Sequence, residues 1–257
     1  MMKDTALHVS NLTVHYDKIP VLWDINLDVP QGKLVGILGP NGAGKSTFIK
    51  ALLGLIKPIS GSVFFLKKRL HETKGKIAYV PQKEAVDWDF PITVIELVLM
   101  GRYPQRGLFR WMKKEDVTSA HEALDLVGMK EYMHRQINEL SGGQQQRAFL
   151  ARALLQDADI YFLDEPLSGV DHTSEEIIMG ILKKMAQSGK TIFMVHHDLN
   201  NVEEYFDWIV LLNVRLIGAG PKMEIFRRDL MQEAYGKNFL LFDETVKISK
   251  DRTSGVM

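Results

Sequence analysis

Apolar residues follow two patterns along the chain, and each pattern predicts a different kind of sheet. Three segments among the first 66 residues alternate apolar and polar positions and are separated by turns, as antiparallel strands are: LHVSNLTVHY, LWDINLDV and SVFFL. The second pattern consists of short apolar runs: LVGILG, KIAYV, DIYFLD, TIFMVHH and WIVLLN. Helical patterns lie between most of these runs, and this alternation predicts a parallel sheet with helices around it.

Residues 86–157 carry helical patterns and no convincing strand. The segments VIELVLMGRY, KKEDVTSAHEALDLVGM and GGQQQRAFLARALL have helix-like spacing. We therefore expect a helical subdomain at 86–157, inserted into an α/β core formed by residues 1–85 and 158–230. Residues 231–257 are expected to form a C-terminal extension that is partly disordered, because the tail KISKDRTSGVM is polar and lacks periodicity. Residues 1–257 then form a single domain.

Composition narrows the class of protein. The 257 residues are 46% hydrophobic and 25% charged, which suits a globular protein with a sizeable core. Lys and Arg number 32, as do Asp and Glu, so the neutral total gives no electrostatic case for nucleic acid binding. The absence of cysteine excludes disulfides and thiolate metal sites and fits a reducing compartment. The N-terminus has no signal-peptide pattern, and every apolar stretch is far shorter than the roughly 20 residues of a membrane helix. We expect a cytosolic chain with no membrane span of its own.

The stretch GPNGAGKST fits the motif G-x-x-x-x-G-K-[ST], with a predicted strand before it and a predicted helix, Phe48 to Ile56, after it. Glycines let the backbone turn tightly with its N–H groups facing an anion, and the helix start adds partial positive charge. This predicts a cradle for a nucleotide triphosphate, in which Lys45 reaches the β/γ-phosphates and the Ser46 hydroxyl ligates Mg²⁺. The nine binding residues are Gly39, Pro40, Asn41, Gly42, Ala43, Gly44, Lys45, Ser46 and Thr47.

Two carboxylates, Asp164 and Glu165, follow the apolar run IYFL. The carboxyl end of a buried strand is where α/β sheets bind their ligands. We expect Asp164 to hold Mg²⁺ and Glu165 to polarise an attacking water as general base. The alternative is a polar turn after a core strand.

A second anion site is predicted at LSGGQQQR. Ser141 is a good helix N-cap, and Gly142 and Gly143 leave backbone N–H groups open at a helix start. One chain would not normally direct two phosphate cradles at one γ-phosphate, whereas two copies facing each other do. The alternative is an ordinary capped helix.

The order of these motifs resembles the ATP-binding subunit of ABC transporters from about residue 7 to about residue 226. GPNGAGKST resembles that family's Walker A motif, DIYFLDEP its Walker B motif with the catalytic Glu165, and LSGGQ its signature, which adds Gln144. The resemblance implies a P-loop NTPase (RecA-like) α/β core with an N-terminal antiparallel β subdomain and an inserted helical subdomain. It also implies an ATPase with ATP and Mg²⁺ as cofactors. It further implies that two copies of the chain form a head-to-tail dimer, in which Lys45 of one copy and Ser141 to Gly143 of the other hold each ATP.

The resemblance assigns further residues that carry little signal alone. Tyr16 takes the place of the aromatic residue that stacks on adenine, although it also suits a half-buried strand. Gln82 resembles the Q-loop glutamine that reaches Mg²⁺ and water, and Asp171 the D-loop residue that crosses the dimer interface. In MVHHDL the switch histidine directly precedes the aspartate, so His197 is expected at the γ-phosphate and His196 in a structural role.

The segment VPQKEAVDWDFPITVIELVLMGRYPQRGLFR resembles ATPases of the bacterial manganese/zinc/iron-type metal importers, especially the manganese branch. This implies a cytoplasmic subunit, peripheral on the inner face of the membrane. Its partners are a second copy, integral membrane permease subunits and, indirectly, an extracellular metal-binding protein. Trp88, Phe90 and Pro91 form an apolar turn that either docks a permease helix or closes the core. Zinc and iron are alternative cargoes. A non-transport ABC ATPase that works in DNA repair or translation is an alternative function, while the LSGGQ motif argues against a P-loop kinase or GTPase.

Overall fold

The computed structural model describes residues 4–17, 19–73, 75–107 and 111–236. Its strands are β1 Thr5–Tyr16, β2 Ile19–Pro30, β3 Leu34–Leu38, β4 Ser60–Phe65, β5 Ile77–Val80, β6 Ile160–Leu163, β7 Thr191–Val195, β8 Trp208–Asn213 and β9 Arg215–Pro221. Its α-helices are α1 Lys45–Leu52, α2 Val94–Leu99, α3 Tyr103–Arg106, α4 Lys114–Leu126, α5 Gly142–Gln156, α6 His172–Gln187, α7 Val202–Tyr205, α8 Lys222–Ile225 and α9 Arg228–Tyr235. Short 3₁₀ turns lie at Leu70–Glu72, Lys83–Ala85, Met100–Arg102, Lys130–Tyr132 and Ile137–Glu139.

The strands form two sheets of the two predicted kinds. In the smaller sheet, of order β2-β1-β4, β1 pairs antiparallel with both neighbours. The larger sheet has the order β5-β6-β7-β3-β8-β9 and is parallel except for the last pair. The predicted fold class is therefore confirmed: a P-loop NTPase core with an antiparallel β subdomain and an inserted helical region.

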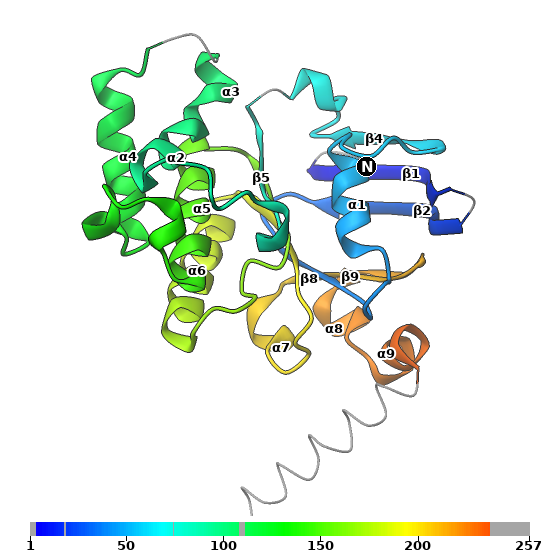
Figure 1. The fold of residues 1–257 in the computed structure, drawn as a ribbon. Coiled ribbons are helices and arrows are strands. Elements are labelled where there is room, and N and C mark those ends of the chain that lie inside the picture. The colour runs from blue at the N-terminus through cyan, green and yellow to red at the C-terminus, as the bar shows by residue number, and fades with distance from the viewer. Residues whose placement is uncertain (1–3, 18, 74, 108–110, 237–257) are drawn as a thin grey trace, which may run out of the picture.

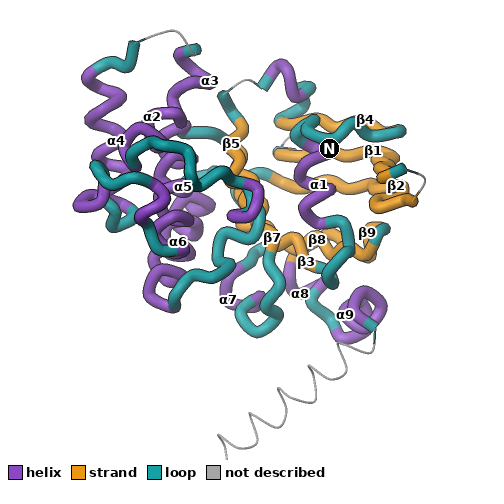
Figure 2. Tube along the Cα trace, viewed as in Figure 1, coloured by secondary structure: helices purple, strands orange, loops and turns teal. Residues whose placement is uncertain are grey.

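The helical region lies between β5 and β6 in the sequence and to one side of the sheets in space. Figure 1 shows α2, α3, α4 and α5 gathered on one side of the molecule, with β1, β2 and β4 on the opposite side. The same division is visible in Figure 2 as helix on one side and strand on the other. Inside this region α5 packs against α2 and α4.

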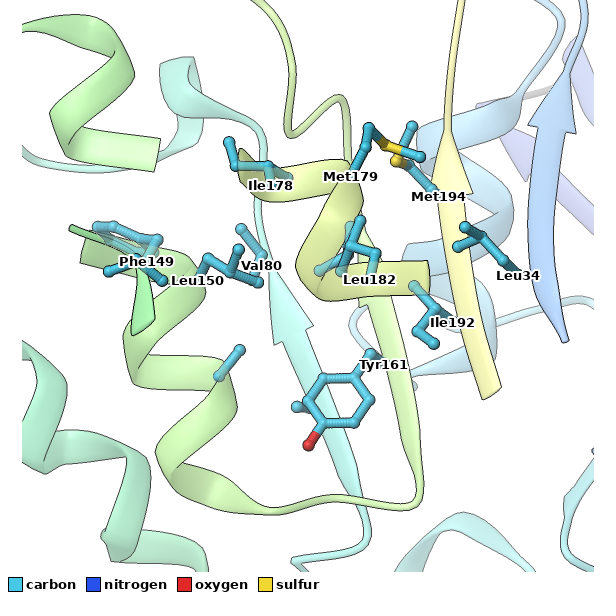
Figure 3. Close-up of a cluster of buried hydrophobic side chains, with 14 of the residues drawn as sticks. Leu34, Val80, Phe149, Leu150, Tyr161, Ile178, Met179, Leu182, Ile192 and Met194 are labelled. Atoms are coloured by element: carbon cyan, nitrogen blue, oxygen red, sulfur yellow. The ribbon is translucent and has the colours of Figure 1, made fainter. Parts of the chain in front are cut away.

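The central strands are buried on both faces, as short apolar runs predict. Along β6, Tyr161 and Leu163 pack into a cluster with helices α5 and α6, which Figure 3 shows from the side of α6. The alternate residues Ile160 and Phe162 face the opposite cluster, which contains the antiparallel sheet and α1. The core thus has two layers with the parallel sheet between them. Neighbouring parallel strands therefore end at one edge, where ligands bind.

The helix after the phosphate loop is shorter than predicted. The helix expected to reach Ile56 ends at Leu52, and Gly54 follows with φ 68°, so Leu55 is 61% exposed instead of packed. A glycine in the left-handed conformation ends a helix readily.

The C-terminal part of the chain contains structure that the sequence pattern did not indicate. Strand β9 adds an antiparallel edge to a sheet expected to be parallel, because the hairpin after Asn213 returns the chain along β8. Helix α9 crosses the boundary predicted between residues 230 and 231, and it buries Met231 and Ala234. The rest of the predicted extension, residues 237–257, lies outside the described residues.

Candidate functional site

The predicted phosphate loop, residues 39–47, connects β3 to α1. Gly39 has φ 150°, and a Cβ there would lie 2.1 Å from the carbonyl oxygen of Leu212. Gly44 has φ 90°, and a Cβ there would lie 2.7 Å from Cδ2 of Leu22. Both positions therefore require glycine, for the backbone conformation and for the close neighbour.

Lys45 is the first residue of α1 and folds back into the loop. It is 6% exposed, and its Nζ donates to the carbonyl oxygens of Gly39, at 2.8 Å, and Pro40, at 3.0 Å. Burial lowers the pKa of Lys45, while the charges of Glu165 and Asp164 oppose that shift. Phosphate oxygens entering the loop would compete with these two carbonyls for the ammonium group.

Asp164 and Ser46 fit a divalent cation. Asp164 is fully buried at the end of β6, and its Oδ1 accepts a hydrogen bond of 2.9 Å from the Ser46 hydroxyl. Among the residues that the structure describes, its Oδ2 has no hydrogen-bond partner. Burial raises the pKa of Asp164, and the Ser46 hydrogen bond opposes this. A buried carboxylate oxygen without a partner, beside a hydroxyl, is a donor set that Mg²⁺ accepts.

Glu165 and Gln82 meet across the carboxyl ends of β6 and β5. Gln82 Nε2 donates to Glu165 Oε2 at 3.2 Å. Glu165 has φ 52°, a left-handed conformation that a residue with a side chain adopts at a cost. The structure thus brings the two residues predicted to handle the attacking water into direct contact.

One pocket of about 460 Å³ unites these groups. Its lining is formed by Val21, residues 41–47, Gln82 and Glu165. A volume of this size lies within the range of small-molecule sites, roughly 300–1,000 Å³. The sequence did not predict Val21 as a residue of this pocket, because an apolar residue on a strand belongs to no recognisable motif.

The two histidines after β7 have different surroundings. A smaller cavity beside Glu165 is lined by both His196 and His197. His197 is exposed, whereas His196 is 4% exposed and packs against the rings of Tyr205 and Phe206. Burial lowers the pKa of His196. His197 is therefore the histidine that a ligand can reach.

The predicted second anion site lies at the start of α5. The Ser141 hydroxyl accepts from the backbone N–H of Gln144 at 3.4 Å, and the Gln144 side chain accepts from the Ser141 N–H at 2.9 Å. Asp171 caps α6 and lies close by, since a Cβ on Gly143 would be 3.1 Å from its Oδ2. Gly142 completes the first turn of α5. The lining of the phosphate pocket includes none of these five residues.

Tyr16 lies at the end of β1, where the chain turns into β2. Its side chain is 49% exposed, so one part of the ring is open to a ligand. The lining of the phosphate pocket does not include it, although Val21 of the neighbouring strand is included.

The fold and this pocket define a class: a P-loop ATPase whose core carries an inserted helical subdomain. Residues 22–168 match the family model described as ABC transporter, and the chain belongs to that family. It is accordingly an ATP-binding ATPase. Subunits of this kind work in transporters as dimers with membrane permease components.

Relatives are similar over nearly the whole chain. A manganese transport system ATP-binding protein, MntB of Bacillus subtilis (strain 168), is 51% identical over 93% of this chain and 96% of its own length. The zinc transport system ATP-binding protein TroB of Treponema pallidum (strain Nichols) is 50% identical over 90% of this chain and 87% of its own. Among solved structures, CbiO1 of Clostridium perfringens, part of the ABC transporter complex CbiONQ, has a TM-score of 0.75 at 26% identity. That match covers 94% of this chain and 100% of CbiO1.

Within the described ranges, every helix falls short of the length or the apolar character that crossing a bilayer takes.

Proposed function

We propose that this chain is the ATP-hydrolysing subunit of a bacterial ABC importer for divalent metal ions, with manganese as the cargo. ATP hydrolysis is supported by one observation: Lys45, Ser46, Gln82 and Glu165 line one pocket, and Asp164 bonds to Ser46 from behind it. The cargo rests on the relatives, whose names include manganese and zinc transport.

The loop of residues 39–47 holds the phosphates of ATP through backbone N–H groups that follow Pro40, and Lys45 neutralises the β/γ-phosphates. Ser46, Asp164 and Gln82 would hold Mg²⁺, which supplies positive charge to the phosphate oxygens when bound. The buried Oδ2 of Asp164 supports this assignment. Tyr16, half-exposed at the strand end, stacks on the adenine.

Glu165 takes a proton from the attacking water, and the water oxygen then bonds to the γ-phosphorus as the bond to ADP breaks. The hydrogen bond from Gln82 orients the Glu165 carboxylate toward this water. His197, exposed beside Glu165, donates a hydrogen bond to the γ-phosphate.

The site is completed by a second copy arranged head to tail. The signature residues Ser141, Gly142, Gly143 and Gln144 of that copy supply N–H groups and a hydroxyl to the γ-phosphate, and Asp171 crosses the interface. Two observations support this arrangement. These residues do not line the phosphate pocket of their own chain, and the start of α5 carries partial positive charge that favours an anion.

The dimer drives integral membrane permease subunits from the inner face of the membrane, and an extracellular metal-binding protein delivers the metal to that permease. The subunit is therefore cytoplasmic and peripheral, and nucleic acid has no part in its work. The metal does not touch this chain.

Cargo is tested by the metal content of cells whose sole copy carries Glu165→Gln, grown under limitation of each metal in turn. We expect manganese alone to fall, and the unmodified chain to restore it. A selective fall in zinc or iron would keep the importer and replace the cargo. Unchanged levels of all three metals would contradict metal import.

A further inference from the structure

The peptide groups on the two sides of Gly39 are held by different parts of the chain. The Gly39 N–H donates to the hydroxyl of Tyr235 at 2.8 Å, and the Gly39 carbonyl accepts from Lys45 Nζ, also at 2.8 Å. Gly39 is itself buried. Tyr235 comes from α9, 196 positions further along the chain.

Helix α9 is anchored where it can hold this contact. Met231 and Ala234 are 1% and 2% exposed, and the Asn213 side chain at the end of β8 donates to the Ala234 carbonyl at 3.0 Å. Figure 1 shows α9 beside α8, on the side of the sheet that carries β9. Burial raises the pKa of Tyr235 to about 12, so its hydroxyl is neutral at ordinary pH.

The turn between β8 and β9 supports the same loop from a second direction. The Val214 N–H donates to the Ala43 carbonyl at 3.1 Å, and Val214 has φ 60°, which is unfavourable for a β-branched residue. The Leu212 carbonyl lies directly behind Gly39. C-terminal residues therefore brace both halves of the phosphate loop.

If residues 39–47 bind phosphates as proposed, nucleotide binding breaks the contacts of Lys45 with the loop and keeps the contact of Tyr235. To reach a phosphate, Lys45 must leave the carbonyls of Gly39 and Pro40. The contact from Tyr235 does not compete with the phosphates, because it is made to the N–H of Gly39 from behind the loop.

We propose that Tyr235 is a positioning residue of the nucleotide site: through Gly39 it keeps the phosphate loop in its binding conformation while Lys45 transfers to the nucleotide. It sets affinity for the phosphates and leaves the chemical step alone. Removal of the hydroxyl leaves the buried Gly39 N–H without its acceptor. The free loop can relieve this cost by leaving its binding conformation, and nucleotide binding must then restore that conformation, so affinity falls.

The test is Tyr235→Phe in the full-length purified chain, compared with Tyr161→Phe. Tyr161 is the matched control because it is also a buried tyrosine, 2% exposed, and its side chain lies in the core cluster with α5 and α6. We expect Tyr235→Phe to weaken Mg-ATP and ADP by the same factor, roughly three- to tenfold, with kcat at saturating ATP unchanged. Tyr161→Phe should lower the melting temperature of the apo protein while leaving nucleotide affinity unchanged.

Wild-type affinity in Tyr235→Phe, or a lower kcat with unchanged KM, would overturn the inference. Lys45→Ala distinguishes a failure of the role proposed for Tyr235 from a failure of the proposed phosphate site. If Lys45→Ala loses nucleotide while Tyr235→Phe binds as wild type, only the role of Tyr235 fails. If Lys45→Ala also binds nucleotide normally, the proposed phosphate site itself fails.

Discussion

At the scale of single residues, His196 and His197 show how position alone separates two identical side chains. Both follow β7, yet the His196 ring packs against Tyr205 and Phe206, whereas His197 is exposed beside Glu165. In the part of the chain that the structure describes, His196 Nε2 has no hydrogen-bond partner. A buried imidazole without a partner for its second nitrogen is best tolerated neutral.

The buried His196 predicts how stability depends on pH. Its folded pKa lies below the ordinary 6.5, so below that pH the unfolded chain binds more protons than the folded protein. This residue's contribution to stability is therefore complete above about pH 6.5 and declines as the pH falls. Asp198 and Glu175 oppose the shift, and His197 adds to it.

We expect the melting temperature of the wild type to fall from about pH 7 to about pH 5, and His196→Asn to show a smaller fall. His172→Asn is the control, because His172 is exposed. Thermal unfolding across this pH range checks the slopes, and equal slopes in both variants would contradict the assignment.

At the scale of elements, β6 joins the two layers of the core. Phe162 stacks on Phe193 of β7, with ring centroids 4.7 Å apart, and meets the edge of Phe65 from β4 at 6.0 Å. These rings link the parallel sheet to the antiparallel one. The same strand ends at Leu163, directly before Asp164 and Glu165, so the packing of β6 also positions the two carboxylates.

Removal of the central ring should therefore be costly. We expect Phe162→Ala to lower the free energy of unfolding by about 3–5 kcal/mol, from lost burial and the cavity left behind. Phe90→Ala, at a side chain that is 50% exposed, is the matched control and should change stability little. Denaturant unfolding of the isolated chain measures both, and equal losses would contradict the role given to Phe162.

The sequence predicted those elements whose signals are local. The phosphate loop, the strand before it, the start of the helix after it and the capped start of α5 each depend on residues within one short segment. Strand β9 was missed because RLIGAGP has two glycines and a proline in seven residues, and its pairing with β8 decides its conformation. The contact of Tyr235 with Gly39 joins residues too distant in the sequence for any periodic pattern to reveal.

At the scale of the whole molecule, each chain carries two halves of different sites. The phosphate pocket holds Lys45, Gln82 and Glu165, while Ser141 and Asp171 lie together elsewhere on the surface. In two copies related head to tail, the phosphate pocket of each copy would face Ser141 and Asp171 of the other, which makes two complete sites. In the dimer proposed above, ATP would lie between the copies, with its γ-phosphate at the start of α5 of the second copy.

ATP-driven dimerisation is tested by the mass of Glu165→Gln in solution, measured by size exclusion with light scattering, with and without Mg-ATP. We expect the variant to bind ATP without hydrolysing it, to form a dimer with ATP and to return to monomer when the nucleotide is removed. Glu122→Gln on the exposed face of α4 is the control and should hydrolyse ATP as the wild type does. A Glu165→Gln variant that hydrolyses ATP at the wild-type rate, or stays monomeric with ATP bound, would contradict the account.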